Sequence, residues 1–254
     1  MTFDLNNFVI DRILRGVALS QDDDTVLFSI NQIQNASLNC ASESTDAVDA
    51  MGTPIATFYR AKSAEFSAEN ALFDMNLMAT QLGTTKKVAS ATSKVIAPAM
   101  ESFTVVEGGK YTLKHAPIAP PVEIYAINGD STFGTKYTKT TNASDTNFAY
   151  AADTHVITLP TGIATGTEMF VMYEYETENA VEVVNSAKNF PVGCKFVMEV
   201  LGCDVCNQTD LVYAYVIFNN AKLSPDFDWS IATDGTHPFS MKAQQDLKYR
   251  SLVA

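Results

Sequence analysis

The closing third of the chain constrains its fold most, because it holds two long runs typical of β-strands. Cys194–Cys203 (CKFVMEVLGC) and Leu211–Phe218 (LVYAYVIF) are rich in Val, Leu, Phe and Tyr and contain no proline. An aromatic turn around Asp226–Trp229 follows, and the segment His237–Asp246 (HPFSMKAQQD) comes after it. This order predicts a long strand pair, then a turn, then a final strand.

The first 93 residues also favour β-structure. Val26–Ile33 alternates apolar and polar positions, and Ala36–Cys40 repeats that alternation, so we expect two early strands. Asp46–Pro54 contains Asp, Gly and Pro, and this composition predicts a loop. Extended structure is expected again over Ile55–Phe66.

A single amphipathic helix is expected after these strands. Ser67 is a suitable N-cap, and Gly83 stands where a helix of this length would end. The residues between them that fall at helical spacing are Leu72, Met75, Ala79 and Leu82. This apolar stripe predicts packing against a sheet, not a cofactor site.

Between about residues 100 and 179 the chain changes to short strands separated by turn residues. Glu107–Lys110 carries two glycines and predicts a hairpin between its flanking strands, and Asn128–Asp130 predicts another turn. Strands at this spacing are typical of a small β-sandwich of immunoglobulin-like form, although no Cys–Trp–Cys signature is present. We therefore expect residues 1–95 and 180–254 to form one β domain, with 100–179 inserted into it.

Composition excludes several classes of protein. The formal net charge is −12, and acidic residues are spread along the chain, so tight binding to nucleic acid is not expected. Met1–Phe8 lacks a basic and apolar leader, and no apolar run approaches the roughly 20 residues that span a bilayer. We expect a soluble protein without a membrane partner.

No constellation of residues indicates catalysis. The histidines His115, His155 and His237 stand outside known catalytic motifs and are interpreted as surface or turn residues. Asp22–Asp24 lacks the ligand spacing and glycine of a calcium loop and is interpreted as a solvated acidic turn. We expect no catalytic, cofactor-binding or metal site and no cofactor.

The cysteines leave three readings open. Cys203–Cys206 forms a single C-x-x-C, and Cys40 and Cys194 stand apart from it. Reduced thiols, a zinc clip made by Cys194, Cys203 and Cys206 with a fourth ligand, and a disulfide are all compatible with this spacing.

In the order of its expected elements and in their sequence patterns, the chain resembles the bacteriophage major tail tube proteins of long-tailed phages. The resemblance rests on the early strands, on Asp49–Phe73 (DAMGTPIATFYRAKSAEFSAENALF), on the C-terminal strands and on Pro238–Asp246 (PFSMKAQQD). It implies a β-sandwich or barrel with one flanking helix, to which this chain adds the inserted β domain.

The resemblance also implies a function. Six copies would form a ring by joining their sheets, and rings would stack into a tube through which double-stranded DNA is ejected without specific binding. The tape-measure, sheath, terminator and baseplate proteins would be possible partners, in the tail of a virion assembled in the host cytoplasm. The candidates for contact between rings are Asp46, Asp49, Met51, Gly52, Thr53 and Pro54.

Two alternatives remain open at this point. One is another virion component, such as a head decoration or baseplate ring protein. The other is a carbohydrate-binding module, in which aromatic residues of the middle segment would form a stacking platform: Tyr125, Phe133, Tyr137, Phe148 and Tyr150. A hydrolase is disfavoured because no catalytic triad is recognisable.

Overall fold

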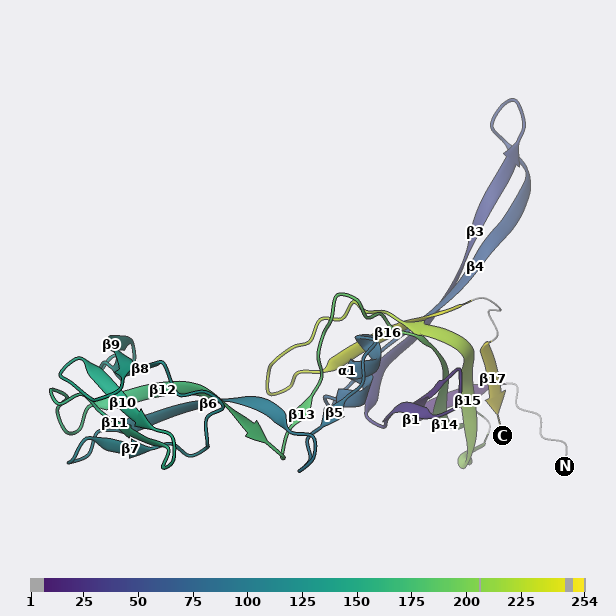
Figure 1. The fold of residues 1–254 in the computed structure, drawn as a ribbon. Coiled ribbons are helices and arrows are strands. Elements are labelled where there is room, and N and C mark those ends of the chain that lie inside the picture. Colours follow the sequence, from purple (N-terminus) through teal and green to yellow (C-terminus); the bar gives the residue numbers. More distant parts are fainter. Residues whose placement is uncertain (1–6, 206, 245–248, 254) are drawn as a thin grey trace. The chain divides into compact units, whose positions relative to one another are not determined.

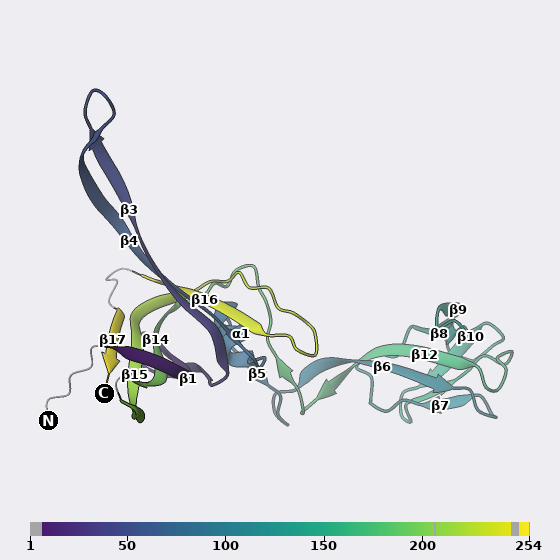
Figure 2. The same ribbon diagram turned by 180° about the vertical axis from the view of Figure 1, so that it is seen from behind.

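The computed structural model describes residues 7–205, 207–244 and 249–253, which form a mainly β protein with a single helix in this part of the chain. Figure 1 and Figure 2 show the elements from opposite sides. In chain order they are β1 (Phe8–Ser20), β2 (Val26–Ile30), β3 (Ile33–Val48), β4 (Pro54–Asn70), α1 (Met75–Gln81), β5 (Lys87–Val88), β6 (Val95–Thr104), β7 (Lys110–Thr112), β8 (Glu123–Ile127), β9 (Phe133–Thr140), β10 (Asn147–Ala151), β11 (Val156–Thr158), β12 (Glu168–Thr177), β13 (Val181–Glu182), β14 (Gly193–Asp204), β15 (Asn207–Leu223), β16 (His237–Ala243) and β17 (Tyr249–Val253).

The chain divides into two compact units. Unit 1 comprises residues 1–86 and 183–254, and unit 2 comprises residues 87–182. That unit 2 is an independently folding insertion with an immunoglobulin-like topology stays a prediction.

Unit 1 is built on an eight-stranded sheet. Seven strands follow the order β2-β1-β14-β15-β16-β4-β3, and β17 pairs with β15 beside them. The predicted closing strands are present as β14, β15 and β16, and β14 and β15 pair antiparallel over most of their length. Five phenylalanines from different strands meet in the core, namely Phe28, Phe66, Phe196, Phe218 and Phe239. Side chains of this size bury enough apolar surface to hold a curved sheet together.

The helix begins later than the sequence predicts. Ser67 is not its N-cap, because β4 continues to Asn70 and Ser67 pairs with Ser240 of β16. Sheet pairing outweighs local helix propensity here. Asp74 is the N-cap instead: its Oδ1 accepts hydrogen bonds from the backbone N–H groups of Asn76 (2.9 Å) and Leu77 (2.7 Å). The predicted end is correct, since Gly83 follows the C-cap Leu82 with a φ of +65°.

His237 is buried, so its interpretation as a surface or turn histidine is wrong. Its Nδ1 accepts the backbone N–H of Asp74 (3.4 Å), which leaves Nε2 to donate to Oε1 of Gln81 (2.8 Å). Phe73 stacks on the imidazole ring, and burial lowers the pKa of His237 below 6.5. The neutral ring thereby ties the start and the end of α1 to β16.

Unit 2 contains a seven-stranded sheet with the order β6-β12-β8-β9-β10-β11-β7. The predicted turn at Asn128–Asp130 joins β8 to β9, but the hairpin predicted around Glu107–Lys110 is wrong. β6 pairs with β12, and β7 pairs with β11, so the two strands lie at opposite ends of the sheet. Long-range pairing has separated strands that a local turn signal joined.

A buried carboxylate organises one part of unit 2. Glu101 accepts hydrogen bonds from the Tyr111 hydroxyl (2.7 Å), from the Tyr173 hydroxyl and from the Lys114 backbone N–H (3.1 Å). Burial together with the bond to Glu101 raises the pKa of Tyr111 to about 12. The two phenols therefore remain donors to Glu101 across the neutral pH range.

Candidate self-association surface

The strands β3 and β4 form a hairpin that projects from the sheet of unit 1, hereafter the arm (Figure 1, Figure 2). Every residue from 34 to 63 is exposed, so over these residues no described part of the chain covers either face of the arm. Cross-strand pairing runs from Ile33 opposite Asn70 to Val48 opposite Pro54. An isolated two-stranded ribbon is only marginally stable in water, so this part of the hairpin has little support of its own.

The predicted inter-ring residues lie at the tip of the arm. Asp46 and Pro54 belong to the strands, so the predicted loop Asp46–Pro54 is shorter than expected and its turn spans residues 49–53. The Asp49 carboxylate accepts backbone N–H groups of Thr53 (2.9 Å) and Met51 (2.8 Å), and these bonds lower its pKa. Gly52 supplies a positive φ of 83° that the tight turn requires. The tip is thus a shaped turn that presents Met51, whose side chain is 91% exposed.

Both faces of the arm carry an aromatic side chain. Phe58 pairs with Thr45 and Tyr59 pairs with Ser44, so these two neighbours point to opposite faces. Phe58 is 53% exposed and Tyr59 is 71% exposed. Exposed aromatic residues on both faces therefore leave apolar surface uncovered on each side of the arm.

The arm also offers unpaired backbone edges. Among the described strands, β3 pairs along one edge only, and β4 meets β16 only between Glu65 and Asn70. At the other end of the sheet β2 pairs with β1 alone. Open edges of this length are templates for strands of another chain.

The sequence signals for this surface were incomplete. The sequence predicts the turn from Asp49, Gly52 and Pro54 and places Phe58 and Tyr59 on opposite faces of an extended segment, but it does not show that both are exposed. One signal was available: residues 34–63 combine small and polar residues with scattered apolar ones and lack a continuous apolar face.

The cysteines do not form a zinc clip made by Cys194, Cys203 and Cys206. Cys194 and Cys203 lie near opposite ends of β14, and nine residues of extended chain span about 30 Å. Cys194 is a buried free thiol whose pKa burial raises to about 11, Cys203 is also free, and Cys206 lies outside the described residues. Asp22–Asp24 forms the turn between β1 and β2, where Asp23 accepts from Thr25, and no metal-binding cluster occurs among the residues that the structure describes.

The aromatic platform predicted for the middle segment is only partly present. Phe148 is fully buried, and Tyr137 and Tyr150 pack against the core of unit 2. Tyr125 and Phe133 do lie together, with ring centroids 5.6 Å apart, and Phe170 joins them.

Comparisons with known proteins agree with a structural role. No curated protein matches the chain. In the described part of the chain no helix has the length and apolar character needed to cross a membrane. A family model described as YomU/Tube protein family matches residues 8–247, which include nearly all the strands described above. Because the match covers most of the chain, the chain belongs to the YomU/Tube protein family.

Proposed function

We propose that this protein is the structural subunit of a phage tail tube and polymerises as stacked rings that conduct DNA during ejection. The observation that carries the proposal is the arm, which is exposed on both faces from residue 34 to residue 63. Membership of a tube protein family supports the same role, which is structural and not enzymatic.

The arm has the chemistry of a contact between subunits. Ile55 is 71% exposed and Met51 is 91% exposed, so the apolar surface extends from the strands to the tip. Burying side chains of this kind contributes about 1.5–3 kcal/mol each when burial is complete. An arm that lies between two neighbouring subunits would cover both Phe58 and Tyr59, and its tip residues Asp46–Pro54 would contact the next ring.

The sheet edges give a route to a closed ring. β2 and β3 are the terminal strands of the sheet path in unit 1. Pairing of one subunit's edge with the opposite edge of its neighbour is a head-to-tail contact, and such contacts close into rings when the rotation permits. Rings of six are what the resemblance to tail tube proteins implies, and stacking along the axis then produces a filament.

The charge of the protein suits a conduit for DNA. The formal net charge of −12 repels phosphates, so a duplex passing through the lumen would not be held. The tube would lie in the virion tail, with tape-measure, sheath, terminator or baseplate proteins as possible partners.

Electron microscopy of the purified, concentrated protein tests this proposal. Hollow tubes or stacked rings with a central channel support it. A matched variant replaces residues 42–62 by a two-residue Asn-Gly turn between Ala41 and Ser63, which pair across the arm. This variant should remain folded, because the deleted residues are all exposed, and should form no tubes. Wild-type protein that stays monomeric at high concentration, and also when seeded with isolated tail tubes, would overturn the proposal.

A further inference from the structure

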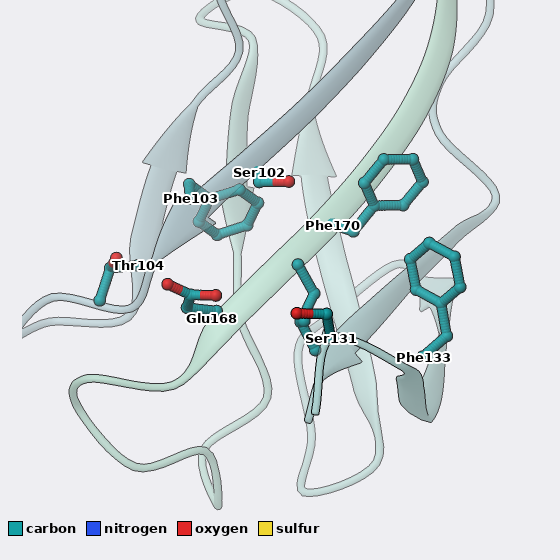
Figure 3. A pocket seen from close by; sticks show the side chains of 8 residues that line it. Ser102, Phe103, Thr104, Ser131, Phe133, Glu168 and Phe170 are labelled. Carbon is teal, nitrogen blue, oxygen red and sulfur yellow. The ribbon is translucent and has the colours of Figure 1, made fainter. Parts of the chain in front are cut away.

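Unit 2 carries a groove that the tube proposal does not use. It has a volume of about 400 Å³ and is lined by Ser102, Phe103, Thr104, Ile127, Ser131, Phe133, Glu168 and Phe170. Figure 3 shows the rings of Phe133 and Phe170 close to one another, with Glu168 and Thr104 away from them. This volume lies within the range of small-ligand sites.

The register of the sheet explains how the groove is built. Glu168 on β12 pairs with Thr104 on β6 and with Ile127 on β8, and Ile127 pairs in turn with Phe133 on β9. Phe133 therefore lies two strands, or about 10 Å, from Glu168. The groove has an aromatic end and a carboxylate end on the same face of the sheet.

The aromatic end is held in place by ring contacts. The Phe133 and Phe170 centroids are 5.0 Å apart at an interplanar angle of 54°, and Tyr125 contacts Phe133 at 5.6 Å. Phe133 is nevertheless 60% exposed, so a ring face remains open to a ligand. An aromatic side chain that is oriented by its neighbours but left exposed is characteristic of a stacking surface.

The turn between β8 and β9 places a hydroxyl beside this ring. Ser131 has a positive φ of 64°, and its N–H donates to the Asn128 carbonyl (2.9 Å). Asp130 accepts from the Thr132 backbone N–H (3.1 Å) and hydroxyl (2.6 Å), which fixes the other side of the turn. A Cβ on Gly134 would lie 2.4 Å from Asn128 Oδ1, so glycine permits this close approach. The turn is therefore fixed before any ligand arrives.

Three polar side chains in the lining of the groove are available to bind a ligand. Among the described residues, the side chains of Ser102, Ser131 and Glu168 make no hydrogen bond or ion pair with the rest of the chain. Glu168 is the one charged residue in the lining, and no Lys or Arg accompanies it. Anionic ligands are disfavoured by this charge, whereas a ligand with hydroxyl donors would satisfy the carboxylate.

We propose that this groove binds a neutral saccharide. One sugar ring would lay its apolar C–H face on Phe133 and Phe170, while hydroxyls on the same or the next ring donate to Glu168 and exchange hydrogen bonds with Ser102 and Ser131. A pyranose combines an apolar face with a rim of hydroxyls, and the groove shows the complementary arrangement. The proposal is independent of tube formation, because every lining residue belongs to unit 2.

Ligand-observed NMR and calorimetry on the full-length protein test the proposal. The probes are four neutral disaccharides (cellobiose, maltose, lactose and N,N′-diacetylchitobiose), with glucuronate and tetramethylammonium as charged comparisons. The variants are Phe133→Ala and Glu168→Gln, and Val122→Ala is the matched control because Val122 is 70% exposed outside the groove. Thermal unfolding establishes that each variant is folded.

We expect saturable binding of at least one disaccharide. Phe133→Ala should raise the Kd of that disaccharide about tenfold or more. Glu168→Gln should weaken binding several-fold through loss of a charge-assisted hydrogen bond, and Val122→Ala should leave it unchanged. The proposal is overturned if none of the four disaccharides binds at 10 mM, or if a folded Phe133→Ala or Glu168→Gln variant binds as the wild type does. Tighter binding of tetramethylammonium or glucuronate than of every disaccharide also overturns it.

Discussion

Removing the exposed aromatic side chains of the arm should weaken tube assembly without unfolding the subunit. The perturbations are Phe58→Ser and Tyr59→Ser, made singly and together. Phe58 is 53% exposed and Tyr59 is 71% exposed, and both lie beyond the part of β4 that packs on the core. Their loss therefore leaves the core of unit 1 intact, and the thermal unfolding midpoint should change little.

The magnitude follows from the area that assembly would bury. Complete burial of a large apolar side chain contributes about 1.5–3 kcal/mol, so covering the exposed part of either ring contributes about 1–2 kcal/mol. Each 1.4 kcal/mol is a factor of ten in an equilibrium constant, so each substitution should raise the critical concentration about 5- to 30-fold. Because the two rings face opposite sides of the arm, their free energies should add, which multiplies the two effects to roughly 25- to 900-fold in the double variant.

Sedimentation of tubes over a concentration series measures this critical concentration, with electron microscopy to identify the pellet. Val122→Ser is the matched control, since it removes a similarly exposed apolar side chain from unit 2. An unchanged critical concentration in the folded double variant would refute the role of the arm in assembly. If one substitution raises the critical concentration strongly and the other leaves it unchanged, a partner covers only one face of the arm.

Three further predictions concern the stability of unit 1 and are checked by thermal or denaturant unfolding. Asp74→Ala removes both N-cap hydrogen bonds of α1 and should cost about 1 kcal/mol, whereas the exposed Leu72→Ala should cost little. Gly83→Ala should cost more than about 1 kcal/mol, because its φ is +65° and a Cβ would lie 2.2 Å from the Phe190 carbonyl oxygen; an unchanged midpoint would contradict that geometry. Burial lowers the pKa of His237 below 6.5, so the unfolded state binds more protons as the pH falls through this value. Stability should accordingly decrease below about pH 6.5 and be fully present above it, and His237→Gln should flatten this part of the profile.

Local sequence patterns predicted strands better than they predicted strand partners. The run Cys194–Cys203 corresponds to β14, because Val and Phe favour strands and the buried Phe196, Met198 and Val200 alternate with less buried neighbours. The turn at Glu107–Lys110 was also recognised, but the strands on either side pair with β12 and β11. Pairing depends on contacts distant in sequence, which local turn chemistry does not encode.

The same limit explains the errors at the helix and at His237. Ser67 has the chemistry of an N-cap, but its segment completes a ladder with β16 that extends β4 by another three residues, to Asn70. His237 precedes a proline, which is typical of a turn, but it is the first residue of β16 and its ring bonds to both ends of the helical segment. Each residue has a role fixed by a partner more than 150 positions away in sequence.

The arm was harder to predict for a different reason. Alternating patterns indicate strands that bury one face. The alternation at Ala36–Cys40 does predict a strand within β3, but β3 and β4 expose both faces beyond the core, so the pattern cannot show that neither face is covered. The tip turn was found from Asp49, Gly52 and Pro54, because turn chemistry is local. The exposed side chains of the arm come together only in the structure, where their positions on the two faces are defined.

The exposed apolar surfaces of the two units differ in the polar groups that accompany them. On the arm, aromatic side chains lie on both faces of a ribbon whose backbone edges are open, and only another polypeptide can satisfy both the rings and the edges. In the groove of unit 2, Phe133 and Phe170 stand beside unengaged hydroxyl and carboxylate groups of side chains, while the strands that carry them are already paired. A small polyhydroxylated ligand matches that second pattern. The chemistry of the exposed groups is therefore the basis for proposing self-association at the arm and ligand binding at the groove.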